Sequence, residues 1–398
     1  KNNKSFNLNQ RTMKQIKNKA LVSIAALSFI MLSVPACSKK EPAPPLVPRP
    51  AIASFSPASV YGGETVTIEG EHFTGAVGVA FGGMQATSFT ITDDNTITAV
   101  VGTGASGDVK VVTPGGIASL PGFILKAPQI DGYDNSNQVN ASHLIAHWPF
   151  DEGPNERLHN AAPVLKGGSQ TFVAGRIGKA VHLEAGWLTY GPESTGASAS
   201  NTPYNSNDTL KDGFTLSLWA QVPPTDKLSN LFQLSVRDIP NWPFIGLAFR
   251  KNGENMFDMD GGIGNVDGTG PHISYAASFM EPGFKDDREW AFLVMRYDGA
   301  DKSMKYYANG VLLKTFDLKT LAGGPFPDPN AVLTVVAPNY PTIGTFQSAA
   351  STPGVSGITV PDYMANGITG NVDDIRFFNA ALTEAEMLAL YHLGEAGR

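Results

Sequence analysis

Cysteine is almost absent from this chain, which has one, Cys37, among 398 residues. A single cysteine excludes an intrachain disulfide and any metal site built from several thiolates of this chain. Long helical patterns are also scarce, whereas 42 glycines and 28 prolines supply many positions for turns. Short alternating segments between such turns are typical of strands. We therefore predict an all-β chain that is stabilised by apolar cores rather than by covalent crosslinks.

Sequence motifs for catalysis are missing as well. The chain contains no G-x-S-x-G, H-E-x-x-H or P-loop pattern, and its seven histidines show no metal-ligand spacing. A glycosidase needs two carboxylates that face each other across a cleft. Asp373 and Asp374 are adjacent in a predicted strand, so their side chains should point to opposite faces. We predict that the protein is not an enzyme.

Positive charge is concentrated at the start of the chain. Residues 1–36 contain six Lys or Arg and no acid, so removing them takes the formal charge from -7 to -13. The remainder has no basic patch that would neutralise phosphates, and we expect no nucleic-acid partner. An acidic surface suits divalent cations or neutral sugars better than anionic ligands.

The first 36 residues have the pattern of a secretory signal. Basic residues precede an apolar stretch over residues 20–34, and Pro35 and Ala36 then lead to the cysteine. The stretch is shorter than the roughly 20 residues that span a membrane, and small residues near its end are typical of a cleavage site. The pattern begins at Met13, so we expect residues 1–12 to be an extension upstream of the signal.

Cys37 follows directly after these small residues, which resembles the lipobox of bacterial lipoproteins. The resemblance implies that Cys37 is acylated and becomes the mature N-terminus; the alternatives are a buried cysteine or an unlipidated signal. Five prolines lie within residues 38–50, so residues 37–50 should form an extended, semi-rigid tether. We predict a lipid anchor in the bacterial outer membrane and display at the cell surface.

Residues 51–126 contain short alternating strands separated by Gly-Gly pairs and other turn signals. About seven strands in this length correspond to a small immunoglobulin-like sandwich. The segment resembles the IPT/TIG family of immunoglobulin-like domains, which implies a spacer rather than a ligand-binding domain. The matching pieces are residues 52–57, 62–73, 79–83 and 107–116.

Residues 127–142 are polar and lack an apolar period, so we predict an interdomain linker. Residues 143–398 then contain longer strands, larger loops and one terminal helix. Thr383 and Glu386 form a capping box at the start of that helix, and Gly394 provides a stop. The predicted strands over these residues are too many for one immunoglobulin-like domain. They indicate a jelly roll of two packed antiparallel sheets.

Six segments in a fixed order make residues 143–394 resemble a concanavalin A-like jelly roll of the bacterial LamG-like kind. The resemblance implies binding of carbohydrate or protein, often with calcium, and usually no catalysis. Fold alone does not specify function, which depends on particular sites. The six segments are residues 147–153, 175–183, 214–219, 290–299, 307–310 and 372–383.

Acidic residues in irregular segments are candidates for Ca²⁺, which prefers carboxylate, amide and carbonyl oxygens. Asp151 follows the opening strand, and in this fold the last strand, with Asp373 and Asp374, lies beside it. The resemblance implies a structural calcium at Asp151 and Asp373. Alternatively, Asp151 caps a turn and Asp374 pairs with Arg376 on a solvated face. A second candidate loop contains Asp258, Asp260, Asn265 and Asp267.

Aromatic rings in polar loops are candidates for stacking on the apolar faces of sugars. Trp148, Trp219 and Trp290 lie in alternating strands and should belong to the core. Other rings lie in proline-bounded or Asn/Ser-rich segments, or follow a glycine. The alternative for each of these rings is that it packs beneath a long loop and binds no ligand. The candidate ligand-binding rings are Trp242, Tyr204, Trp187 and Tyr190.

The predicted function is non-catalytic binding of polysaccharide by a surface lipoprotein, with the first domain as spacer and the jelly roll as ligand module. A tethered binder gains avidity on a long glycan through repeated weak contacts. An outer-membrane transporter complex is a further expected partner. The alternative is an adhesin or protein-interaction module, and a third reading is a glycan-active hydrolase.

Overall fold

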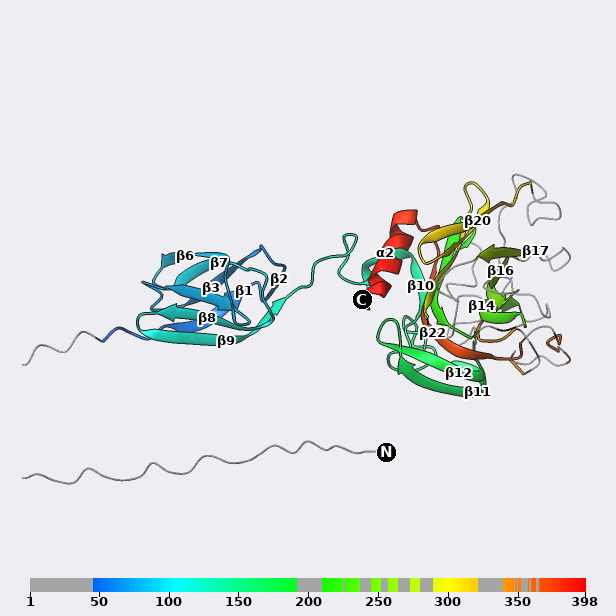
Figure 1. Ribbon diagram of the computed structural model, residues 1–398, viewed down its shortest axis with the longest axis horizontal. Helices are drawn as coiled ribbons and strands as arrows, with labels where there is room; N and C mark the ends of the chain where they lie inside the picture. Colours follow the sequence, from blue (N-terminus) through cyan, green and yellow to red (C-terminus); the bar gives the residue numbers. More distant parts are fainter. Residues whose placement is uncertain are drawn as a thin grey trace, which may run out of the picture.

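Two β-rich units follow each other along the chain, and one α-helix lies near its C-terminal end (Figure 1). The computed structural model describes residues 46–191, 210–236, 245–251, 257–263, 273–279 and 289–398, apart from 224, 226, 321–338, 347, 349, 352–356, 358, 363 and 364. The predicted all-β class, a small immunoglobulin-like sandwich followed by a jelly roll with a terminal helix, is confirmed. In the part of the chain that is described, no helix is long and apolar enough to cross a membrane.

The first unit is a sandwich of two sheets with strand orders β1-β3-β7-β6 and β2-β9-β8-β4-β5. Alternate side chains, such as Val66 and Ile68 in one sheet and Val109 and Val111 in the other, are fully buried between the sheets. This period of two is the reason that the segment folds as strands. The strands are β1 (Ala51–Ser56), β2 (Ser59–Val60), β3 (Thr65–Glu71), β4 (Gly78–Phe81), β5 (Met84–Gln85), β6 (Ser88–Asp93), β7 (Thr96–Val100), β8 (Gly107–Thr113) and β9 (Gly116–Leu125).

In its described residues, the second unit contains thirteen antiparallel strands in the order β17-β16-β15-β14-β21-β12-β22-β13-β18-β19-β20, with β10 paired to β22 and β11 paired to β12. The strands are β10 (Leu144–Trp148), β11 (Pro163–Ala174), β12 (Lys179–Tyr190), β13 (Gly213–Gln221), β14 (Ser229–Val236), β15 (Ile245–Lys251), β16 (Phe257–Ile263), β17 (Ile273–Phe279), β18 (Ala291–Asp298), β19 (Ser303–Ala308), β20 (Val311–Asp317), β21 (Asn339–Ile343) and β22 (Ile368–Phe378).

The first and last strands of this unit are neighbours, as predicted, because β10 pairs with β22 from Leu144↔Phe378 to Trp148↔Ile375. β12 pairs with β22 through its first half and with β21 through Leu188 and Thr189. The β12–β22 register shifts between Leu183 and Gly186, just before β12 pairs with β21. The end of β10 therefore lies beside the middle of β22 and the start of β12.

The inner core is formed by every second residue of the strands. Leu216 and Leu218 of β13 belong to it, whereas Trp219 belongs to a second cluster on the outer face of the same strand. Rings fill much of the inner core, and Trp148 lies 5.5 Å from Tyr190 and 5.4 Å from Phe232 between ring centroids. β13 is buried on both faces because the terminal helix covers its outer side.

Helix α2 (Glu384–Glu395) begins with the predicted capping box. The Thr383 hydroxyl accepts the N–H of Glu386, and the Glu386 carboxylate accepts the N–H of Thr383 at 2.8 Å. Met387, Leu390 and Leu393 are buried against the outer cluster. Figure 1 shows α2 on the side of the jelly roll from which the connecting segment arrives.

The prediction that Gly394 ends the helix is wrong, because α2 continues to Glu395. The actual stop is Gly397, which has a φ of 70° and is followed by an N–H···O bond of 2.8 Å from Arg398 to Leu393. Gly394 serves close packing instead. A Cβ at Gly394 would lie 2.6 Å from Nε1 of Trp219, so only glycine fits against this ring.

Candidate functional site

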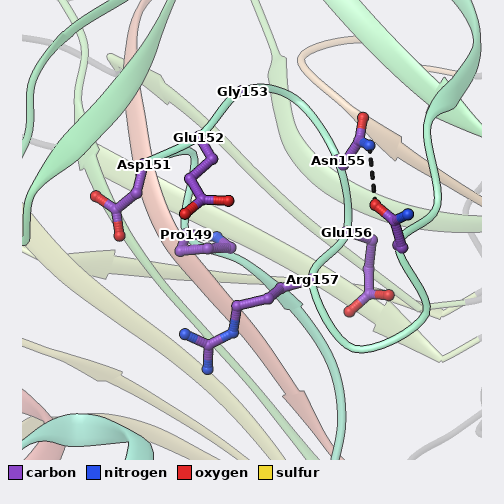
Figure 2. Close-up of a pocket in the computed structure, with 8 residues that line it drawn as sticks. Pro149, Asp151, Glu152, Gly153, Asn155, Glu156 and Arg157 are labelled. Atoms are coloured by element: carbon purple, nitrogen blue, oxygen red, sulfur yellow. Dashed lines mark hydrogen bonds between the residues drawn. The ribbon is translucent and has the colours of Figure 1, made fainter.

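A polar cleft of about 400 Å³ lies at the end of β10, where the chain turns through residues 149–160 (Figure 2). Its exposed side chains supply carboxylate, amide and guanidinium groups, and Asn155 donates to the side-chain oxygen of Asn160 at 3.2 Å. These groups can accept hydrogen bonds from one ligand, and donate hydrogen bonds to it, from several directions. The lining residues are Pro149, Asp151, Glu152, Gly153, Asn155, Glu156, Arg157 and Asn160.

The backbone of this loop is shaped by residues in the left-handed region. Phe150 has a φ of 60° and Asn160 a φ of 51°, while Gly153 has a φ of 130°. The Phe150 side chain is fully buried and anchors the start of the loop. The hydroxyl of Tyr190 donates to the carbonyl of Pro154 and anchors its middle.

Glu156 organises the loop from inside. Its side chain is 1% exposed, and its carboxylate accepts backbone N–H groups from His147, Leu158 and His159 at 2.7, 2.9 and 2.8 Å. Nδ1 of His159 lies 2.8 Å from the same carboxylate. With both oxygens engaged, Glu156 positions the backbone of the cleft rather than a ligand.

A buried ionic cluster lies beside the cleft, on β10 and β22. Asp374, at a φ of 46°, accepts from Nε2 of His147 at 2.7 Å and from Nε of Arg376 at 2.9 Å. Burial favours a higher pKa for Asp374, but the charge of Arg376 and the bonds from both partners outweigh it and hold the pKa well below its usual range. Burial and the nearby Arg376 lower the pKa of His147, which is therefore neutral at pH 7.

Asp151 and Asp373, the predicted calcium ligands, both face the turn between β11 and β12. Asp151 accepts the N–H of Lys179 at 2.8 Å, and Asp373 accepts the N–H groups of Arg176 and Ile177 at 2.7 and 2.9 Å. Burial raises the pKa of Asp373 to about 8. The second oxygen of Asp373, Oδ1, is buried and has no hydrogen-bond partner.

Several predicted features of the acidic residues need correction. Asp374 pairs with Arg376, but the pair is buried rather than on a solvated face. Asp258 and Asp260 lie within β16, paired to β15 and β17, rather than in a loop; Asn265 and Asp267 lie outside the described residues. Within the described ranges, no group of three His, Cys, Asp or Glu is placed to hold a metal ion.

Of the four predicted ligand-binding rings, the two that the structure describes are not at an exposed surface. Tyr190 is fully buried and Trp187 is 7% exposed, so the prediction that these two stack on a sugar is wrong. Both lie in β12, which has partner strands on both sides, and the Trp187 ring covers Gly167 of β11. Trp242, Tyr204 and Cys37 lie outside the described residues.

The predicted core tryptophans agree better with the structure. Trp148 and Trp219 are fully buried, and Trp290 is half-buried against the outer cluster. Of the polar cleft residues, Glu156, Arg157 and Asn160 were not anticipated. The run from residue 151 to 157 signals a polar turn, but its letters do not show which of its acids points inward.

Residues 50–120 match the IPT/TIG domain family. This confirms the predicted resemblance of the first domain. A search of curated proteins found no match to the chain.

Two solved structures are distantly similar to this chain. Domain 4 of AbnA, a GH43 extracellular arabinanase from Geobacillus stearothermophilus, in complex with arabinotriose, is 16% identical with a TM-score of 0.40, covering 62% of this chain and 98% of that domain. The binding domain of Paraclostridial Mosquitocidal Protein 1 is 14% identical with a TM-score of 0.41, covering 63% of this chain and 52% of that one. The chain thus spans about half of that toxin binding domain. Likenesses of this distance do not indicate a ligand.

Proposed function

We propose that this protein is a non-catalytic carbohydrate-binding lipoprotein of the bacterial outer membrane, with the IPT/TIG domain as a spacer. The observation that carries the proposal is the polar cleft at residues 149–160. Its volume of about 400 Å³ is in the range of small-ligand sites. Carboxylate and amide oxygens accept from sugar hydroxyls, and amide and guanidinium N–H groups donate to them.

The rigidity of the loop supports a binding role. Glu156, Tyr190 and Phe150 hold its backbone from inside, so the exposed side chains start from a fixed frame. A ligand that meets a preorganised site loses less free energy to ordering of the protein.

The charge of the cleft favours a neutral glycan. Asp151 and Glu152 are exposed at its rim, and Arg157 is the one cation among the lining residues. A uronic acid or sulfated sugar would bring its own negative charge beside these carboxylates. The acidic balance of the chain beyond residue 36 acts in the same direction.

The arrangement of carboxyl groups supports binding without catalysis. A glycosidase needs a general acid with a raised pKa opposite a second carboxylate. Asp373 has the raised pKa, but it lies beneath the turn at residues 175–178 and not among the lining residues. Glu156 is saturated with donors, and Asp151 and Glu152 are adjacent in one turn.

The test is affinity electrophoresis and calorimetry with a panel of neutral and anionic polysaccharides. We expect a neutral polysaccharide to bind and Asn155→Ala to weaken it about fivefold, since one hydrogen bond contributes about 1 kcal/mol. Asn366→Ala, in a separate cavity before β22, is the matched control and should bind normally. Absence of binding across the panel would refute the proposal. Loss with Trp242→Ala but not Asn155→Ala would instead place the sugar at Trp242.

A structural calcium ion at Asp151 and Asp373 remains part of the proposal. The buried, unpartnered Oδ1 of Asp373 and the exposed carboxylate of Asp151 approach the same turn and are oxygen ligands of the kind that Ca²⁺ takes. If the ion binds the native state, a chelator lowers the melting temperature and added Ca²⁺ restores it. A melting temperature that is unchanged by chelator argues against the site.

An apolar groove favours a second candidate function, an adhesin or protein-interaction module. It has a volume of about 290 Å³ between α2 and the β18–β20 strands, and Leu312 and Leu388 are 44% and 38% exposed at its edge. Exposed apolar surface of this kind can mark a protein contact. Under this alternative, Leu312→Ser with Leu388→Ser reduces adhesion of cells that display the protein and leaves polysaccharide binding intact.

A further inference from the structure

The segment predicted as a linker, residues 127–142, is bound closely to the jelly roll. It contains the short 3-10 helices η1 (Ser136–Gln138) and η2 (Ala141–His143). Val139 between them is 1% exposed and belongs to the outer cluster with α2. Ile130 and Tyr133 pack against the same cluster and close a tight turn through two N–H···O bonds of 2.9 Å.

The last turn of α2 and the residue Arg398 after it bond to this segment along its length. Arg398 donates to the carbonyls of Pro128 and Asp134 at 2.9 and 3.0 Å. Nδ1 of His392 lies 2.7 Å from Asp131. These contacts begin at Pro128, only a few residues after the last strand of the first domain.

β22 contributes the buried part of the attachment. Arg376, which is 2% exposed, donates to the carbonyl and the hydroxyl of Ser136 at 3.1 and 2.8 Å and to the amide oxygen of Asn137 at 3.1 Å. The Asp374 carboxylate accepts from Nε and Nη2 of the same guanidinium. Buried charge-assisted bonds of this kind are among the strong polar contacts in proteins.

The first domain contacts the same segment through its own end. The hydroxyl of Tyr61 donates to the carboxylate of Asp134, and this bond is the main reason that the pKa of Tyr61 is raised. The ammonium of Lys126 lies 4.9 Å from the centroid of the Tyr61 ring. Lys126 is itself held in the sandwich, because its N–H donates to the carbonyl of Val60 at 2.8 Å.

Very little chain is left between the two sets of contacts. Lys126 is bonded within the first domain and Pro128 is bonded to Arg398, so Ala127 alone separates them. A residue before proline is restricted to extended conformations, and proline fixes its own φ. The connection therefore lacks the freedom of a polar linker of sixteen residues.

We propose that residues 128–143 are a rigid joint that belongs to the jelly-roll domain and holds the IPT/TIG domain in one orientation, with Tyr61 and Asn137 as positioning residues. The partner surface on the first domain is its end with Tyr61 and Lys126. Asn137 also accepts from Arg157 at 2.9 Å, so the joint contacts a residue of the polar cleft. The joint and the cleft are thus connected by the hydrogen bond between Arg157 and Asn137.

The test measures distances between the domains by pulsed electron paramagnetic resonance in the full chain. Cys37→Ser removes the native thiol, and labels are attached through Glu71→Cys and Lys319→Cys, which are exposed positions on the two domains. We expect one narrow distance peak. A broad distribution would overturn the proposal, because independent motion is the usual behaviour of domains joined by a flexible linker.

Two variants test the positioning residues without removing a buried charge. Tyr61→Phe deletes the hydroxyl that bonds to Asp134, and Asn137→Ala deletes the oxygen shared by Arg376 and Arg157. Each should replace the narrow peak with a broad distribution. Ser54→Ala deletes an exposed hydroxyl–carboxylate bond inside the first domain and should leave the peak unchanged. A narrow peak in both test variants would refute the assignment of these residues.

Discussion

Asp373 illustrates how burial decides the chemistry of one residue. Its carboxyl group is buried against the turn at residues 175–178, and burial raises its pKa to about 8 from 3.8. Between pH 3.8 and about pH 8, Asp373 is protonated in the folded protein but has lost its proton in the unfolded chain. The free energy of unfolding therefore falls as pH rises through this window, by up to about 1.4 kcal/mol per pH unit.

We predict that, in calcium-free buffer, Asp373→Asn flattens the pH dependence of the melting temperature between pH 6.5 and 8. Asparagine keeps an oxygen for the N–H groups of Arg176 and Ile177 but does not titrate. The window starts at pH 6.5, the usual pKa of histidine. His147 has a lowered pKa, so its protonation in the unfolded chain reduces the free energy of unfolding only below that pH. Asp317→Asn, at an exposed turn, is the control and should keep the wild-type slope. An equal slope of melting temperature against pH in the wild type, Asp373→Asn and Asp317→Asn would contradict the burial argument.

Helix α2 shows how one element depends on a neighbouring ring. Its capping box was predictable because Thr383 and Glu386 are three residues apart. The role of Gly394 was not, because its contact, Trp219, lies on a distant strand. The sequence marks Gly394 as a breaker, whereas the structure requires a residue without a side chain in the last turn.

We predict that Gly394→Ala lowers the free energy of unfolding by about 1–3 kcal/mol, the usual cost of overpacking. The added methyl would lie 2.6 Å from Nε1 of Trp219, so the helix or the ring must move. Chemical denaturation measures the loss. Trp219→Phe in the same protein provides space, so the two substitutions together should cost less than the sum of each alone. Additive costs would show that the two side chains do not compete.

At the scale of the whole molecule, the proposed lipid anchor at Cys37 would decide where the cleft is displayed. We predict that wild-type protein partitions into detergent with the membrane fraction and that Cys37→Ser releases it, because the acyl chains would be lost. Ser38→Ala, at the neighbouring position, should remain with the membrane. Metabolic labelling with a fatty-acid analogue gives an independent reading. Labelling of the Cys37→Ser variant would contradict lipidation at this residue.

The order of domains follows from local signals along the chain. Alternating apolar residues, Gly-Gly turns and the capping box at Thr383 are all patterns among residues that are close in the sequence. Such patterns predict strands, helix boundaries and domain types. Asp151, Glu152 and Asn155 lie together for the same reason, since these residues share one loop.

Only the tertiary structure decided which polar and aromatic residues face inward. Tyr190 and Trp187, which follow a glycine, were candidates for exposed rings but are buried by strands from other parts of the chain. The supposed linker is tied to the jelly roll because Arg376 meets Ser136 across 240 positions. Local sequence determines the type of each segment, whereas burial and charge pairing depend on partners that only the folded chain brings together.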